Sequence, residues 1–124
     1  MLEHTCLIVN DDPAVRRYVH AVLGHDGLQS LEAPDAAAAI RIVEQREGRI
    51  DLIVSDIKMP GEIDGIDLAY SVRERFPAIP VVLITGFGQD EVIEGAGRDF
   101  PLVFKPFRAA TFQTIARQAM ATRE

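Results

Sequence analysis

The residue whose setting most favours chemistry is Asp56, which directly follows the apolar segment 50–55. Three other apolar segments also end in polar residues: Asn10-Asp11-Asp12, Thr85, and Lys105-Pro106. In an open parallel sheet the carboxyl ends of the strands converge on one crevice, so residues that are distant in sequence can become neighbours there. A carboxylate, an acidic cluster, a hydroxyl group and a lysine in one crevice would suit a site that accepts a phosphoryl group.

The acidic residues at this crevice would need a cation, because carboxylates gathered at one place repel one another. Mg²⁺ is a hard ion that takes oxygen ligands and usually keeps several waters. Asp11 and Asp56 are expected to bind it directly. Asp12 precedes Pro13, so we favour a helix cap over a metal ligand for its carboxylate. Asn10 could offer a carbonyl oxygen but brings no charge, so metal affinity should depend more on the two aspartates.

Thr85 and Lys105 would supply the groups that a phosphorylated aspartate needs. The hydroxyl would donate to one phosphoryl oxygen, and the ammonium group would neutralise another. The carboxylate of Asp56 would be the nucleophile of an in-line transfer, without a general base because it is already ionised at neutral pH. Taken singly, a loop-capping aspartate, a strand-end threonine and a solvated lysine are ordinary structural residues. Only their combination indicates chemistry.

The segments that must position these residues follow an alternating pattern. Short β-branched runs, expected as strands near 5–10, 28–33, 51–56, 80–85 and 101–104, alternate with stretches of helical period, which is typical of βαβ units. Three apolar stripes at helix spacing should face the core. They are Val15, Tyr18, Val19, Val22 and Leu23; Ile66, Ala69, Val72 and Phe76; and Phe112, Ile115 and Ala119. Glycines between 86 and 100 leave only 89–94 as helix-forming material, so we expect a short or frayed helix there.

Length and composition limit the classes of protein to consider. The 124 residues contain no repeat or linker, so we expect one domain over 1–124. A formal net charge of −6 argues against nucleic acid as a partner. No segment reaches the ~20 apolar residues of a membrane span, so no membrane partner is expected. The single cysteine, Cys6, is expected to be a small buried hydrophobe and suits a reducing cytoplasm.

With these features together, the chain resembles the receiver domain of two-component response regulators over essentially its whole length. The motifs that carry the resemblance are Ile8-Val9-Asn10-Asp11-Asp12-Pro13, Val54-Ser55-Asp56-Ile57-Lys58-Met59-Pro60-Gly61, Asp64-Gly65, Ile84-Thr85-Gly86 and Phe104-Lys105-Pro106-Phe107. The resemblance implies an α/β, doubly wound, flavodoxin-like fold: a five-stranded parallel sheet in order 2-1-3-4-5 with helices on both faces. It also implies phosphorylation of Asp56 by a histidine kinase or a histidine phosphotransfer protein, with Mg²⁺, and a downstream protein target that the sequence does not identify.

The resemblance also assigns roles to individual residues. Thr85 would be the switch hydroxyl, and Lys105 the cation that binds the phosphoryl group. The backbone carbonyl of Lys58 would complete the metal ligands. Gly86 would leave room for the phosphoryl group, and the bond from Lys105 to Pro106 is expected to be cis.

Four features depart from the family pattern. Asn10 replaces the first of two usual acidic residues, and Glu62-Ile63 makes the loop after Pro60 one residue longer. Leu102 stands where a switching tyrosine or phenylalanine is usual, and the segment from Thr85 to Lys105 is about two residues short. We therefore hypothesise that phosphorylation orders the segment 86–100, with Phe87 as the aromatic that repacks. Amide exchange across that segment would test this hypothesis.

Other functions fit the residues less well. The main alternative is a receiver-like docking module that is never phosphorylated, against which the joint presence of Asp56, Thr85 and Lys105 argues. A hydrolase with an aspartyl nucleophile would need a second acid at the position of Lys58, and a flavin carrier would need a phosphate-cradling loop after the first strand. As an enzyme the chain would be marginal, limited to self-phosphorylation from a donor and slow hydrolysis. We expect no output domain after Glu124, so output would come through a partner, and we expect a monomer or weak homodimer.

Overall fold

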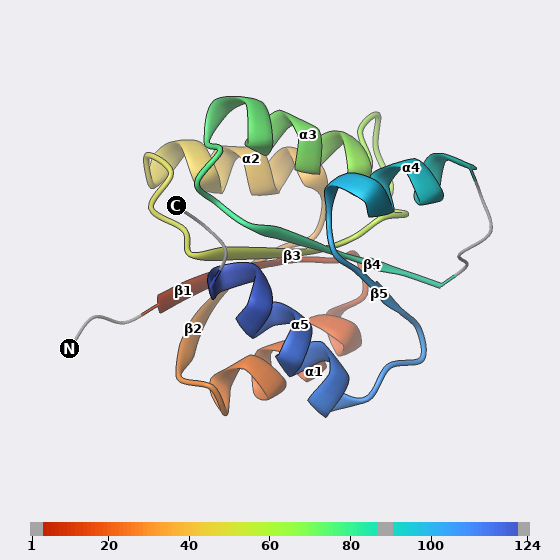
Figure 1. Cartoon of the computed structure of the whole chain (residues 1–124). Helices are drawn as coiled ribbons and strands as arrows, with labels where there is room; N and C mark the ends of the chain where they lie inside the picture. The colour runs from red at the N-terminus through yellow and green to blue at the C-terminus, as the bar shows by residue number, and fades with distance from the viewer. Residues whose placement is uncertain (1–3, 87–90, 122–124) are drawn as a thin grey trace.

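The computed structural model of the chain describes residues 4–86 and 91–121, leaving aside the side chains of 91–94. Strands and helices alternate along it (Figure 1). The strands are β1 (His4–Val9), β2 (Leu28–Ala33), β3 (Leu52–Asp56), β4 (Val81–Thr85) and β5 (Leu102–Phe104). The helices are α1 (Pro13–Gly24), α2 (Ala36–Gln45), α3 (Gly65–Arg75), α4 (Glu91–Asp99) and α5 (Ala109–Ala121). None of the described helices is long and apolar enough to cross a membrane.

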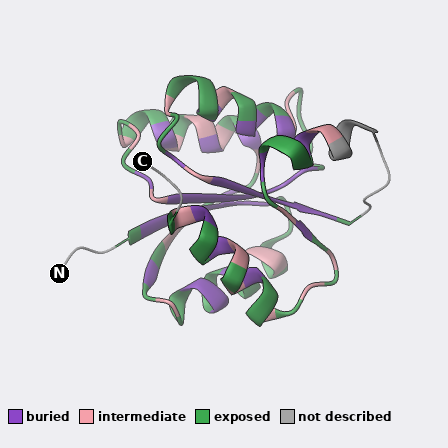
Figure 2. Ribbon diagram, viewed as in Figure 1, coloured by how far each residue is buried: buried purple, intermediate pink, exposed green. Residues whose placement is uncertain are grey.

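The strands form one parallel sheet in the order β2-β1-β3-β4-β5, which confirms the predicted fold. Helices α2, α3 and α4 cover one face of the sheet, and α1 and α5 cover the other (Figure 1). The central strands are therefore buried on both sides, and all five residues of β3 and of β4 are buried (Figure 2). This explains why their sequences are apolar runs rather than alternating patterns.

The sheet divides the core into two apolar layers. Leu7, Val9 and Ile53 belong to the layer shared with α2 and α3. Cys6 and Ile8 belong to the layer shared with α1 and α5. Burial raises the pKa of the Cys6 thiol, so this side chain packs as a hydrophobe, as expected from the sequence.

Aspartates cap three of the helices. Asp12 accepts a hydrogen bond from the backbone N–H of Ala14 at 2.9 Å, with Pro13 as the first helical residue of α1. Asp35 caps α2 in the same way, and Asp64 caps α3. The preference for Asp12 as a helix cap is thus confirmed.

One of the residues predicted to face the core is exposed. Tyr18 keeps 44% of its surface accessible, so its assignment to the core is wrong. Its ring lies 5.9 Å from that of Phe107, at the edge of the layer formed with α5. A large aromatic at the border of a helical stripe can pack one side of its ring and still leave the other in water. Val19, Val22 and Leu23 of the same stripe are buried as predicted.

Helix α4 is short, as expected, but it continues through both of its glycines. It has nine residues and includes Gly95 and Gly97. A Cβ atom at Gly97 would lie 2.9 Å from Cδ1 of Leu102, so the glycine lets α4 approach β5 closely. The end of the helix is anchored by Phe100, which is buried and lies edge-on to the Tyr70 ring at 5.0 Å. Phe87, the proposed switch aromatic, lies outside the described residues.

Candidate functional site

The carboxyl ends of β3, β4 and β5 form one pocket at the edge of the sheet. Its volume is about 450 Å³. The described residues that line it are Asp56, Lys58, Thr85, Gly86, Lys105 and Pro106. All of them were expected at the site from sequence, so the fold brings them together as the strand-end argument requires.

Asp56 and Lys105 form an ion pair in this pocket. Nζ of Lys105 lies 3.1 Å from Oδ1 of Asp56, and their side chains are 36% and 10% exposed. Burial raises the pKa of Asp56 above its usual range, and the nearby charge of Asp11 raises it further. The hydrogen bond and positive charge of Lys105 act in the opposite direction without cancelling the effect of burial. The result is a partly desolvated carboxylate that is held by one cation.

The β4–β5 ladder sets Lys105 beside Thr85. The backbone N–H of Lys105 donates to the carbonyl oxygen of Thr85 at 2.8 Å, and Thr85 is 4% exposed. The peptide bond from Lys105 to Pro106 is cis, as expected. A Cβ atom at Gly86 would meet no described atom within 4 Å. The described structure therefore leaves space on this side of the pocket.

The end of β1 supplies the acidic part of the site. Asn10 is 2% exposed, and its Oδ1 accepts from the backbone N–H of Asp12 at 2.9 Å. Asp11 is exposed and lies near enough to Asp56 for its charge to affect that pKa. No group of three or more histidine, cysteine, aspartate or glutamate side chains is arranged for a metal ion within the described residues. The carboxylates available there are those of Asp11 and Asp56.

Arg16 anchors this end of the strand, a role that the sequence did not reveal. Its Nη1 donates to the carbonyl oxygen of Asn10 at 2.6 Å, and its Nε donates to Oε1 of Glu32 at 2.9 Å. The guanidinium group thereby ties α1 to the ends of β1 and β2. A basic residue one helical turn after Asp12 is the only sequence signal for it.

Gly65 holds the backbone of Asp56 from the other side. A Cβ atom at Gly65 would lie 2.0 Å from the carbonyl oxygen of Asp56, which is impossible without a shift of the backbone. The N–H of Gly65 also donates to the carbonyl oxygen of Ile57 at 2.8 Å. Gly65 belongs to the Asp64-Gly65 motif, but the sequence alone assigns no role to it. The structure shows that only glycine lets α3 start this close to the end of β3.

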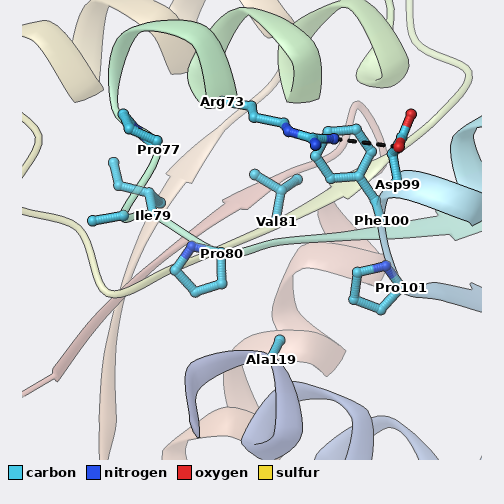
Figure 3. Close-up of a pocket in the computed structure, with 10 residues that line it drawn as sticks. Arg73, Pro77, Ile79, Pro80, Val81, Asp99, Phe100, Pro101 and Ala119 are labelled. Atoms are coloured by element: carbon cyan, nitrogen blue, oxygen red, sulfur yellow. Dashed lines mark ion pairs between the residues drawn. The ribbon is translucent and has the colours of Figure 1, made fainter. Parts of the chain in front are cut away.

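A second pocket lies at the opposite end of the sheet, before β4 and β5 begin (Figure 3). Its volume is about 230 Å³, and its walls include Pro80, Pro101 and Phe100. The charged residues among its described lining are Arg73 and Asp99, which pair with each other at 3.5 Å. This pocket offers no group comparable to Asp56, so we place the chemistry at the carboxyl edge.

A parallel sheet in this order, with a strand-end aspartate held by a lysine and flanked by a buried threonine, defines the class of phosphoacceptor receiver domains. The sequence pattern of the response regulator receiver domain matches residues 6–117, and the chain belongs to this family. Its function is that of a receiver in two-component signalling. The alternative of a docking module that is never phosphorylated is not favoured.

Individual relatives agree with this assignment. The chain is 32% identical over 124 residues to the nitrogen assimilation regulatory protein NtrX of Azorhizobium caulinodans, covering 98% of this chain and 27% of that protein. The receiver domain of NtrX from Brucella abortus superposes with a TM-score of 0.85 at 30% identity, covering 94% and 98% of the two chains. A response regulator receiver protein from Sinorhizobium medicae gives 0.88 at 27% identity, covering 98% of each. The chain thus spans about a quarter of the length of its curated NtrX relative.

Proposed function

We propose that Asp56 accepts a phosphoryl group from the phosphohistidine of a histidine kinase or a histidine phosphotransfer protein. The observation that supports this most directly is the pair between Asp56 and Lys105 at 3.1 Å, beside the buried Thr85. Phosphorylation would change how the domain binds a downstream protein. The domain would act in the cytoplasm and would itself be a monomer or weak homodimer.

The transfer needs little from the protein beyond position and charge. A carboxylate oxygen of Asp56 attacks the phosphorus in line while the phosphorus–nitrogen bond of the donor breaks, and the leaving imidazole keeps that electron pair. The Lys105 ammonium group changes its ion-pair partner from the Asp56 carboxylate to a phosphoryl oxygen, and the Thr85 hydroxyl donates a hydrogen bond to another phosphoryl oxygen. Because both groups are placed before the reaction, they stabilise charge as it develops.

The same pocket suits Mg²⁺. Burial is the main cause of the raised pKa of Asp56, and repulsion by the Asp11 carboxylate adds to it, so a cation between the two carboxylates would relieve that repulsion. We propose these two carboxylates and the backbone carbonyl of Lys58 as the protein ligands, with waters completing the shell. Asp12 is engaged as a helix cap and is left out of the set. Bound Mg²⁺ would neutralise the phosphoryl oxygens during transfer.

The intact mass of the protein tests this proposal. Wild type, Asp56→Asn and the exposed-loop control Glu62→Gln are incubated with a small-molecule phosphoryl donor, with Mg²⁺ or with a chelator. We expect one Mg²⁺-dependent phosphoryl adduct in wild type and control, and none in Asp56→Asn. A folded wild type that forms no adduct, or a mutant that still forms it, would contradict the proposal.

A further inference from the structure

Asn10 carries a buried amide nitrogen that lacks a hydrogen-bond partner among the described residues. The residue is 2% exposed, and its Nδ2 is buried without a partner among the described residues. Buried polar groups are nearly always paired, because an unpaired donor loses its hydrogen bonds to water without replacement. This N–H₂ group stands out because Asn10 follows β1 directly, next to the strand β3 that ends in Asp56.

The orientation of the amide follows from its neighbours. The backbone N–H of Asp12 needs an acceptor, so the atom that faces it at 2.9 Å must be Oδ1, and Nδ2 is the other atom. The backbone of Asn10 is held as well, because its N–H donates to Ala33 and its carbonyl oxygen accepts from Arg16. The amide is thus fixed with its oxygen committed to the turn and its nitrogen free to donate.

The strand register places this donor beside Asp56. Val9 of β1 pairs with Ser55 of β3, so one further step along the same register sets Asn10 next to Asp56. Register partners in parallel strands direct their side chains to the same face of the sheet. Both residues are buried, at 2% and 7% exposure. A group attached to Asp56 would therefore form next to Nδ2.

As a hydrogen-bond donor, Nδ2 of Asn10 cannot bind a metal ion but can bind a phosphoryl oxygen. An N–H₂ group cannot ligate a cation, and it cannot accept a hydrogen from a metal-bound water. A phosphoryl group brings three strong acceptor oxygens. We infer that Asn10 is a further hydrogen-bond donor to the phosphoryl group on Asp56, and that it is not a ligand of Mg²⁺. This inference rests on the proposed function.

Two substitutions separate the donor from the rest of the side chain. Asn10→Asp keeps the acceptor for the Asp12 N–H and replaces the donor by a carboxylate oxygen. Asn10→Ser keeps a turn acceptor and adds no charge. Gln118→Glu makes the same amide-to-acid change on the exposed side of α5 and serves as the control. Thermal unfolding of each variant shows that it is folded.

Two affinities are measured for each variant: that for Mg²⁺ alone by titration calorimetry, and that for beryllofluoride, a phosphoryl mimic, at saturating Mg²⁺ by NMR. We expect both Asn10 variants to bind beryllofluoride more weakly by roughly tenfold to a hundredfold, the usual value of a hydrogen bond to a charged group. Asn10→Asp should bind Mg²⁺ roughly tenfold more tightly because it adds a carboxylate. Asn10→Ser and Gln118→Glu should leave Mg²⁺ binding unchanged.

The outcomes distinguish the inference from the proposal on which it rests. If wild type binds beryllofluoride and both Asn10 variants bind it equally well, the inference is wrong and the proposed function stands. If Asn10→Ser weakens Mg²⁺ binding, Asn10 is a metal ligand and the inference is wrong. If folded wild type does not bind beryllofluoride with Mg²⁺ present, both are wrong.

Discussion

At the scale of single residues, the site depends on a carboxylate that the fold partly removes from water. The desolvation of Asp56 raises its pKa, and Lys105 at 3.1 Å offsets only part of that effect. The ionised form is therefore held at a cost in folding free energy, as is usual for groups whose task is chemical. A cation or a phosphoryl group in the pocket changes the charge balance around the same atoms.

This electrostatic cost predicts the effect of Asp56→Asn on stability. Because the folded-state pKa is raised above the ordinary 3.8, ionised Asp56 destabilises the folded protein at neutral pH. That penalty grows as pH rises from the ordinary pKa of 3.8 to the raised folded-state pKa, stays constant above it, and is lost as pH falls below 3.8. In the absence of Mg²⁺, we expect Asp56→Asn to have a higher free energy of unfolding than wild type at pH 7. Urea denaturation at neutral and acidic pH measures it.

The matched control for this prediction is Glu74→Gln, which neutralises an exposed carboxylate on α3. Its stability should equal that of wild type within about 0.5 kcal/mol, as for most surface substitutions. A mutant at Asp56 that is no more stable than wild type at pH 7, or that keeps its advantage in acid, would show that burial of this charge costs nothing.

At the scale of elements, the junction between β3 and α3 determines where Asp56 sits. The first residue of α3, Gly65, lies against the carbonyl oxygen of Asp56, and the capping box of Asp64 and Asp67 fixes the start of the helix. The loop of residues 57–64 is therefore held at both ends, by the end of β3 and by the start of α3. Gly65 thus affects the position of the Asp56 carboxylate through the backbone.

Gly65→Ala should therefore disturb both stability and the site. The added methyl group would lie 2.0 Å from a backbone oxygen, so strand and helix must separate. We expect a loss of at least ~2 kcal/mol in unfolding free energy, in the range of overpacked cores, together with slower formation of the Asp56 adduct. Gly24→Ala at the end of α1, where a Cβ atom would meet nothing within 4 Å, is the control and should be nearly neutral. Equal behaviour of the two variants in denaturation would contradict this account.

Helix α4 and β5 show how the chain accommodates an unusual residue. Leu102 occupies the position where the family commonly has a switching aromatic, so no ring can rotate there. The Leu102 side chain lies close to Gly97. The Tyr70 hydroxyl donates to Asp99 at 2.5 Å and holds the end of α4 to α3. The hypothesis that phosphorylation orders residues 86–100 stays a prediction for amide exchange.

At the scale of the whole molecule, the sheet is stabilised by apolar layers on both faces. Phe112 of α5 is fully buried in one of them and lies 5.5 Å from the ring of Phe107. A domain of this size usually unfolds as one cooperative unit with a total stability of only about 5–15 kcal/mol. A loss of packing in one apolar layer should therefore destabilise the entire fold, including the pocket at the edge of the sheet.

Phe112→Ala should lower the unfolding free energy by about 3–5 kcal/mol, through lost burial and the cavity that remains. Phe104→Ala removes the same side chain from a position that is 49% exposed and should cost less than about 1.5 kcal/mol. Urea denaturation followed by circular dichroism and by tyrosine fluorescence measures both. A similar cost for the two variants would contradict the assignment of the core, and separated transitions would contradict a single cooperative unit.

Much of this protein could be predicted from the sequence because the decisive signals are local. A strand buried on both faces must be a largely apolar run, and a polar residue marks its end, as at Asp56 and Thr85. Asp12 before Pro13 announces a helix cap in two adjacent residues. Connections between parallel strands allow few topologies, so the convergence of the strand ends could be predicted from the sequence.

The remaining features depend on atoms that come from distant parts of the chain, and only the tertiary structure decided them. Tyr18 has the spacing of a core residue, but the border of the packed layer leaves it exposed. The task of Gly65 appears only when α3 meets the Asp56 backbone. The amide nitrogen of Asn10, which has no partner among the described residues, and the raised pKa of Asp56 likewise arise from burial among several elements. Periodicity predicts which residues turn inward, whereas close approach and desolvation are set by packing.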